Sequence, residues 1–105
     1  MCTLKLYKAT SFWARLRGLH AYNGLSPHTG LYIAPCRAIH TIGLSYPIDV
    51  VFLDKYHRVL AQRHHLAPWR LACCPVGAAV VELPGGYCDA HPDFRQAIYA
   101  ALTST

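Results

Sequence analysis

The chain has few acidic residues and no long apolar run. Only five of its 105 residues are Asp or Glu, against ten Lys or Arg, so the formal net charge is +5 with His neutral. Hydrophobic residues make up 53% and charged residues 14%, a balance typical of a folded globular chain rather than a disordered one. No apolar segment approaches the roughly 20 residues that a membrane-spanning helix requires.

Three further features are missing. The N-terminal sequence MCTLKLYKATSFW has no apolar signal-peptide core, so we expect a cytoplasmic protein. The five cysteines are odd in number and include no C-x-x-C pair, which predicts reduced, partly buried thiols. The basic residues are scattered and accompany no recognition motif, so nucleic-acid binding is not expected. A chain of this length has room for one core, which predicts a single domain over residues 1–105.

The strongest structural signal is the segment from Pro35 to Asp54. Within it, the sequence IDVVFL over Ile48–Leu53 is apolar except for Asp49, and this pattern predicts a strand buried on both faces. The next four residues have the length of a hairpin turn, with Asp54 placed where an Asx side chain closes the turn. We therefore expect the return strand over Arg58–Leu66.

The remaining elements predict a mainly β fold, which is α+β by strict count. Further strands are expected over Thr3–Tyr7, Leu31–Ala34, Ala38–Thr41 and Ala78–Leu83. Helices are expected over Phe12–Arg17 and from about Asp93 to Leu102, with an irregular connection through Cys73-Cys74-Pro75. These elements predict a small antiparallel β-sandwich or barrel with two short peripheral helices.

Two carboxyl groups interrupt apolar strands. Asp49 lies in IDVV and Glu82 in VVEL, where a buried carboxylate costs several kcal/mol unless it is hydrogen-bonded or paired. The favoured interpretation is structural, with each carboxylate accepting bonds from loop amides or from an arginine. The candidate arginines are Arg37, Arg63 and Arg70. The alternative is a polar pocket in the sheet that both carboxylates share.

A catalytic alternative uses the segment that precedes the buried strand. Cys36, His40 and Asp49 are the residue types of a nucleophilic thiol, its base and an orienting acid. They would make the chain a cysteine-dependent hydrolase or transferase. However, free cysteines are mostly buried and inert, and nothing in the sequence marks Cys36 as an activated thiolate. We therefore favour a protein that is not an enzyme.

A metal-binding protein is a third alternative. Cys88 and His91 form one possible ligand pair, with two residues between them. The vicinal pairs Cys73-Cys74 and His64-His65 are poor chelators, because neighbours in a strand point to opposite faces. We therefore assign no metal site and expect no cofactor.

Several motifs together carry a family resemblance over roughly residues 3 to 86. They are RLRGL at Arg15–Leu19, Thr41, the strand from Pro47 to Asp54, Arg58–Ala61, and ELPGG at Glu82–Gly86. In this order the motifs resemble the family called domain of unknown function 192. The chain departs from the family pattern at Ala38–Thr41, where many members have Trp-Met before Lys/Arg-Asn-Thr. It departs again at Tyr87–Leu102, which is helical by pattern where members usually continue into a closing strand.

The resemblance implies a compact, mostly β domain of sandwich or barrel type, found in bacteria and archaea, and implies no activity. Relatives that look exported, or that occur beside secretion and pilus-assembly proteins, imply an accessory role in envelope processes. We expect an uncharacterised domain that binds a small polar ligand or a protein partner. Its site is expected in a concavity bordered by Gly18, Leu19, His40, Thr41, Asp49 and Glu82.

Overall fold

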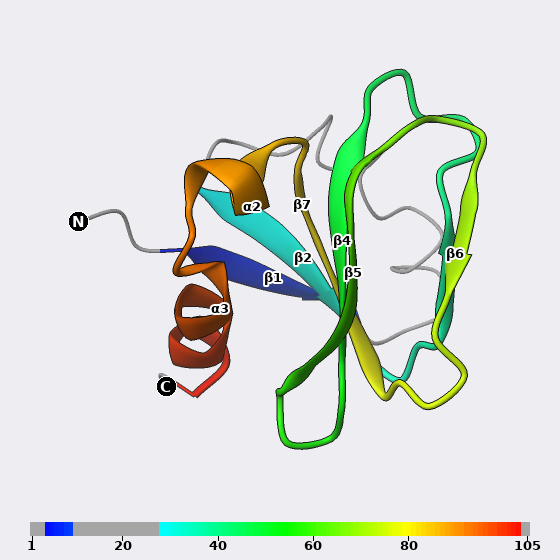
Figure 1. Cartoon of the computed structure of the whole chain (residues 1–105). Coiled ribbons are helices and arrows are strands. Elements are labelled where there is room, and N and C mark those ends of the chain that lie inside the picture. Colours follow the sequence, from blue (N-terminus) through cyan, green and yellow to red (C-terminus); the bar gives the residue numbers. More distant parts are fainter. Residues whose placement is uncertain (1–3, 10–27, 104–105) are drawn as a thin grey trace.

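The structure is a computed structural model that describes residues 4–9 and 28–103 (Figure 1). These residues form seven strands and two helices. The strands are β1 (Lys5–Ala9), β2 (Thr29–Ile33), β3 (Ala38–His40), β4 (Ile48–Leu53), β5 (Val59–Leu66), β6 (Leu71–Cys73) and β7 (Ala79–Pro84). The helices are α2 (Tyr87–Ala90) and α3 (Phe94–Thr103).

The strands form two sheets. Five of them make the main sheet in the order β1-β2-β7-β4-β5, and β3 pairs with β6 in a small second sheet. The main sheet ends at β1 and β5, so it is open and sandwich-like, and the barrel alternative is not realised. All pairs are antiparallel except β1 with β2, which is parallel and corrects the expectation of a purely antiparallel sheet. The connection over residues 10–28 has the length that the crossover between parallel strands requires.

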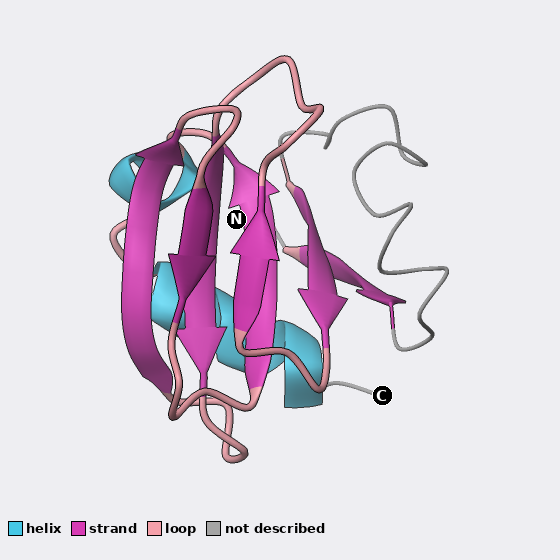
Figure 2. Ribbon diagram, turned by 90° about the vertical axis from the view of Figure 1, so that its right-hand side faces the viewer, coloured by secondary structure: helices cyan, strands magenta, loops and turns pink. Residues whose placement is uncertain are grey.

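The main sheet separates two layers of apolar side chains. On one face, Leu31, Val50 and Val80 pack with Ile39 of β3 and Ala72 of β6. On the opposite face, the alternate residues of β4 and β7 pack against α2 and α3; among them are Val51, Val81 and Leu83, with Phe94 and Ile98 from α3. Figures 1 and 2 show both helices on one side of the main sheet, and Figure 1 shows β6 on the other side of β4.

The central hairpin is confirmed as predicted. β4 covers Ile48–Leu53, and all six of its residues are buried. In the turn that follows, Asp54 Oδ1 accepts hydrogen bonds from the amides of Tyr56 at 2.7 Å and Arg58 at 2.9 Å. The Arg58 guanidinium also lies 3.0 Å from Asp54 Oδ2. The Asx side chain therefore closes the turn as its position in the sequence indicated.

Three elements differ from the expectation. The first strand lies at Lys5–Ala9, two residues later than predicted. No strand was expected before the irregular connection through Cys73-Cys74-Pro75, but Leu71–Cys73 forms β6, because its backbone pairs with β3. Three residues are too few to show a strand period. The short helix α2 was not expected as a separate element. The expected helix over Phe12–Arg17 lies outside the described residues, as do Gly18 and Leu19. Neither described helix is long and apolar enough to cross a membrane.

Candidate functional site

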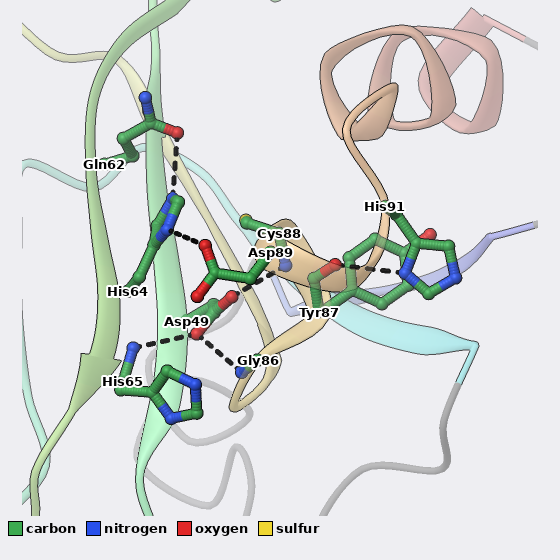
Figure 3. Close-up of polar contacts among 9 residues, drawn as sticks. All are labelled: Asp49, Gln62, His64, His65, Gly86, Tyr87, Cys88, Asp89 and His91. Carbon is green, nitrogen blue, oxygen red and sulfur yellow. Dashed lines mark hydrogen bonds and ion pairs between the residues drawn. The ribbon is translucent and has the colours of Figure 1, made fainter.

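The Asp49 carboxylate joins three segments of the chain on the helix-covered face of the main sheet (Figure 3). Its Oδ1 accepts hydrogen bonds from the amide N–H groups of His65 at 2.9 Å and Gly86 at 3.0 Å. Its Oδ2 accepts a third bond from the Cys88 amide at 2.8 Å. The sequence suggested loop amides or an arginine as partners of the buried carboxylates. Within the described residues, three backbone amides donate hydrogen bonds to Asp49.

A β-bulge brings the His65 amide to Asp49. Ile48 pairs with Leu66 and Val50 with Arg63, so two residues of β5, His64 and His65, lie opposite Asp49 alone. His65 has a φ of 53°, a left-handed conformation that non-glycine residues seldom adopt. This extra residue bends the edge strand and directs the His65 N–H toward the carboxylate. The bond to Asp49 therefore fixes the irregular part of β5.

Gly86 adopts a backbone conformation that allows its amide to reach Asp49. Gly86 has a φ of 88° and precedes α2, and its N–H points at Asp49. A Cβ at Gly86 would also lie 3.3 Å from the His65 ring. At the neighbouring Gly85, a Cβ would lie 2.8 Å from the Pro47 carbonyl oxygen, closer than real Cβ contacts permit. The Gly-Gly pair after β7 therefore lets the chain turn tightly into α2.

Opposing effects set the charge of this cluster. Burial raises the pKa of Asp49, but the three amide hydrogen bonds outweigh it and hold that pKa below its usual value. The carboxylate is therefore charged at neutral pH. Burial, together with the neighbouring Asp49 charge, raises the pKa of the Cys88 thiol to about 12. Cys88 is thus a neutral thiol, unsuited to nucleophilic attack.

Two histidines lie beside α2: His64, which the sequence marked as a poor chelator, and His91, which it paired with Cys88 as a possible metal ligand. His64 lies 3.0 Å from Asp89 through Nδ1 and 3.1 Å from the Gln62 side-chain oxygen through Nε2. His91 stacks on the Tyr87 ring at 4.1 Å between centroids, and its Nδ1 lies 3.0 Å from the Tyr87 carbonyl oxygen. No group of three His, Cys, Asp or Glu side chains in residues 4–9 and 28–103 is placed to hold a metal ion. The metal-binding alternative has no support there.

Glu82 lies on the opposite face of the main sheet from Asp49. Its Cα partners are Leu31 on β2 and Val50 on β4, whereas the partner of Asp49 is Leu83. Since paired residues share a face and neighbours alternate, the two carboxyl groups are separated by the sheet. The structure therefore does not bring Asp49 and Glu82 into one pocket.

The side chain of Glu82 is largely buried in an apolar layer. The residue is 7% exposed, and among the fully buried side-chain polar atoms of the described residues only His28 Nδ1 lacks a hydrogen-bond partner, so the Glu82 carboxyl oxygens are not shut off from solvent and unpaired. Burial raises the pKa of Glu82 to about 7. Tyr46 is its electrostatic neighbour, because burial and the charge of Glu82 both raise the pKa of the Tyr46 hydroxyl. Glu82 is therefore partly neutral and partly charged near pH 7.

Thr41 is fully buried and holds a loop. Its hydroxyl donates to the Ala67 carbonyl oxygen at 2.7 Å and accepts from the Arg70 amide at 2.8 Å. Its backbone N–H donates to the Arg70 carbonyl oxygen, and its own carbonyl accepts from Trp69 N–H. Thr41 therefore fixes the turn over 67–70 to the end of β3, which leaves its hydroxyl committed to the fold.

The three residues of the catalytic alternative lie in different places. Cys36 is 8% exposed in the core between the sheets, and its thiol donates to the Ala38 carbonyl oxygen at 3.0 Å. His40 is exposed on the outer side of β3, and its Nδ1 accepts from the Ile42 amide at 3.3 Å. Asp49 is buried beneath α2. The thiol, the imidazole and the carboxylate therefore form no catalytic arrangement.

The fold defines the class of the protein as a small, mostly β, sandwich-like domain with two short helices. The chain belongs to the family DUF192, described as Uncharacterized ACR, whose model matches residues 2–92. This confirms the resemblance seen in the sequence. No curated protein matches the chain.

Two solved structures share the fold. One is a protein of unknown function from Novosphingobium aromaticivorans DSM 12444, with 18% identity and a TM-score of 0.72 over 83% of this chain and 67% of that one. The other, from Sinorhizobium meliloti 1021, is named as a candidate transcription regulator; it has 17% identity and a TM-score of 0.73 over 83% of this chain and 73% of that one. At this level of identity the likeness extends to the fold alone.

Proposed function

We propose that this domain binds a small polar ligand through the carboxyl group of Glu82. The observation that supports the proposal is a carboxyl group that is largely buried in an apolar layer, where burial raises the pKa of Glu82 to about 7. Moving a carboxylate out of water costs free energy unless it is paired or hydrogen-bonded. An apolar residue would fill the same position between Leu31 and Val50 without that cost. A ligand that donates a hydrogen bond to the carboxyl group would account for its place there.

The chemistry of the ligand follows from the surroundings of Glu82. Its neighbours on this face are apolar apart from the Tyr46 hydroxyl, so the carboxyl group is the main charged contact that this part of the inter-sheet layer offers. A carboxylate accepts hydrogen bonds and favours a positively charged donor. Small ligands that carry an amine, a guanidine or an amide N–H match this group. Sugars and carboxylic acids, which bring no cation, match it less well.

The proposal is tested with a panel of small amines, amino acids, guanidines, sugars and carboxylates. Binding is measured by chemical-shift changes in ¹H-¹⁵N spectra of the whole chain and by the shift in melting temperature. We expect amine-bearing compounds to bind and to move resonances of β2, β4 and β7 around Glu82. Binding should disappear in Glu82→Leu and persist in Asp93→Asn, a matched change at an exposed acid. No binding by any compound, or equal binding by Glu82→Leu, would refute the proposal.

We also propose that residues 1–105 act as a single domain in the cytoplasm. The four cysteines of the described part, Cys36, Cys73, Cys74 and Cys88, are free thiols, which favours a reducing compartment. Fractionation of cells that express a tagged chain tests the location. Recovery of the protein outside the cytoplasmic fraction would refute it.

A further inference from the structure

Three large apolar side chains are exposed together at one end of the small sheet. Ile42 is 50% exposed, Trp69 is 66% exposed and Leu71 is 72% exposed. The backbone places them side by side: Trp69 N–H donates to the Thr41 carbonyl oxygen at 3.1 Å, and Leu71 pairs with His40 on β3. Single exposed apolar residues are ordinary, whereas a group of three at one place indicates a contact surface.

The backbone beneath this group is held in one conformation. Trp69 has a φ of 62°, which is a rare and strained conformation for a bulky side chain. The turn is kept in place by the buried Thr41, whose hydroxyl and backbone bond Ala67, Trp69 and Arg70. A surface residue that is fixed before binding loses less conformational entropy when a partner arrives. The backbone that carries the Trp69 side chain is therefore fixed before a partner binds.

The charges around this group have one sign. His40 and Arg70 are exposed beside the three apolar residues, whereas Arg37 lies at the other end of the small sheet, next to Cys74. All five acidic residues of the chain lie elsewhere: Asp49 and Glu82 are buried in the main sheet, Asp54 closes the β4–β5 turn, and Asp89 and Asp93 lie in and beside the helices. No carboxylate of this chain neutralises Arg70, so a negatively charged partner is electrostatically favoured.

We infer that this end of the small sheet docks a protein segment in which acidic residues alternate with large apolar ones. The docking surface, called the Trp69 surface below, consists of His40, Ile42, Trp69, Arg70 and Leu71. A second copy of this chain would bring two positive surfaces together. A nucleic acid could stack a base on Trp69, but it would meet one arginine and therefore make few phosphate contacts. The acidic segment satisfies both the apolar and the charged part of the surface.

The test uses fluorescent peptides and the whole chain. The probe is a short peptide in which Asp and Glu alternate with Leu and Phe, and binding is followed by fluorescence anisotropy. One control peptide replaces the acids with Lys, and a second replaces the apolar residues with Ser. An oligo-dT strand serves as the nucleic-acid probe. We expect only the acidic, apolar peptide to bind, and its affinity to fall as salt rises from about 0.05 to about 0.3 M, because salt screens the charge of Arg70.

Variants locate the binding. Trp69→Asn keeps a residue that tolerates the left-handed conformation, and Arg70→Glu reverses one charge. Both should raise the peptide Kd at least about tenfold. Matched controls lie on α3, on the opposite side of the main sheet (Figure 1): Tyr99→Ser removes a side chain that is 53% exposed, and Arg95→Glu reverses an exposed charge. Neither control should change the Kd, and melting temperatures verify that all four variants fold.

Three results would overturn the inference. The first is equal binding of the peptide by Trp69→Asn and by the unaltered chain. The second is binding of oligo-dT, but not of the peptide, with loss in Arg70→Glu. The third is self-association in sedimentation that Trp69→Asn abolishes, which would make a second copy the occupant. None of these outcomes involves Glu82, so the inference and the proposed ligand site succeed or fail separately.

Discussion

Asp49 and Glu82 lie on neighbouring strands, one residue out of register, and their side chains point to opposite faces of the main sheet. Asp49 faces the helices and accepts three amide hydrogen bonds. Glu82 faces the small sheet, is 7% exposed and lies among apolar side chains. One buried acid is thus charged and satisfied, and the other is held partly neutral by burial. The two acids should therefore make the free energy of unfolding depend on pH in opposite directions.

Glu82 should make the protein less stable as the pH rises. Its pKa is about 7 in the folded state and 4.5 ordinarily, so between these values the folded chain holds a proton that the unfolded chain has released. Stability therefore falls with rising pH across this window, by about 3 kcal/mol in total at roughly 1.4 kcal/mol per pKa unit. Urea unfolding of the unaltered chain and Glu82→Gln from pH 4.5 to 8 measures this difference. All other ionisable groups are present in both proteins and cancel in the comparison. Parallel curves would show that Glu82 does not titrate with a raised pKa.

Removing the Asp49 carboxylate should destabilise the fold at neutral pH. Asp49→Ala leaves the amides of His65, Gly86 and Cys88 without their acceptor, at a cost of roughly 2 to 4 kcal/mol. Because the folded pKa of Asp49 lies below the ordinary 3.8, its contribution is present above that value and is lost as the pH falls through the folded pKa. The cost of the substitution should therefore shrink in acid. Asp93→Asn is the control, and an unchanged urea midpoint for Asp49→Ala would contradict the assigned role.

The hydroxyl group of Thr41 should stabilise the turn over residues 67–70. Thr41→Val keeps the shape but removes the acceptor of the Arg70 amide and the donor to the Ala67 carbonyl oxygen, which should cost roughly 1 to 3 kcal/mol. Thr41→Ser retains the hydroxyl and should cost less. Amide hydrogen exchange at Trp69 and Arg70 gives the local measure, since both amides are bonded to Thr41. Similar exchange rates in Thr41→Val and Thr41→Ser would show that the hydroxyl does not fix the turn.

The sequence revealed the elements that depend on local chemistry. Six consecutive positions with one polar residue predicted β4, and the Asx chemistry of Asp54 predicted its turn. The features that the sequence could not reveal depend on pairing between distant segments. The opposite orientations of Asp49 and Glu82 follow from the register of β4 with β7. The bulge that places His65 on Asp49 breaks the strand period in a way no local pattern marks. His64 and Asp89 are 25 positions apart in sequence, and only the folded edge strand brings them together.

Exposed and buried cysteines should be alkylated at different rates in the folded chain. Of the four described cysteines, Cys73 is exposed on the outer side of β6, whereas Cys36, Cys74 and Cys88 are buried. Burial and the Asp49 charge raise the pKa of Cys88 to about 12, which suppresses its thiolate. The Cys36 thiol donates a hydrogen bond to the Ala38 carbonyl oxygen, and His40 lies on the outer side of β3, away from it. Alkylation with iodoacetamide near neutral pH, followed by peptide mapping, should therefore label Cys73 first.

The same experiment tests the catalytic alternative. A nucleophilic thiol would react faster than an exposed, ordinary one, because the thiolate is the reactive form. His40→Ala should leave the alkylation rate of Cys36 unchanged, since the imidazole lies on the outer side of β3. Cys73→Ser supplies the control for competition between sites. The contrary result would be that Cys36 reacts ahead of Cys73 and that its reaction slows in His40→Ala. The imidazole would then act on the thiol, and a cysteine-dependent activity would again be the better interpretation.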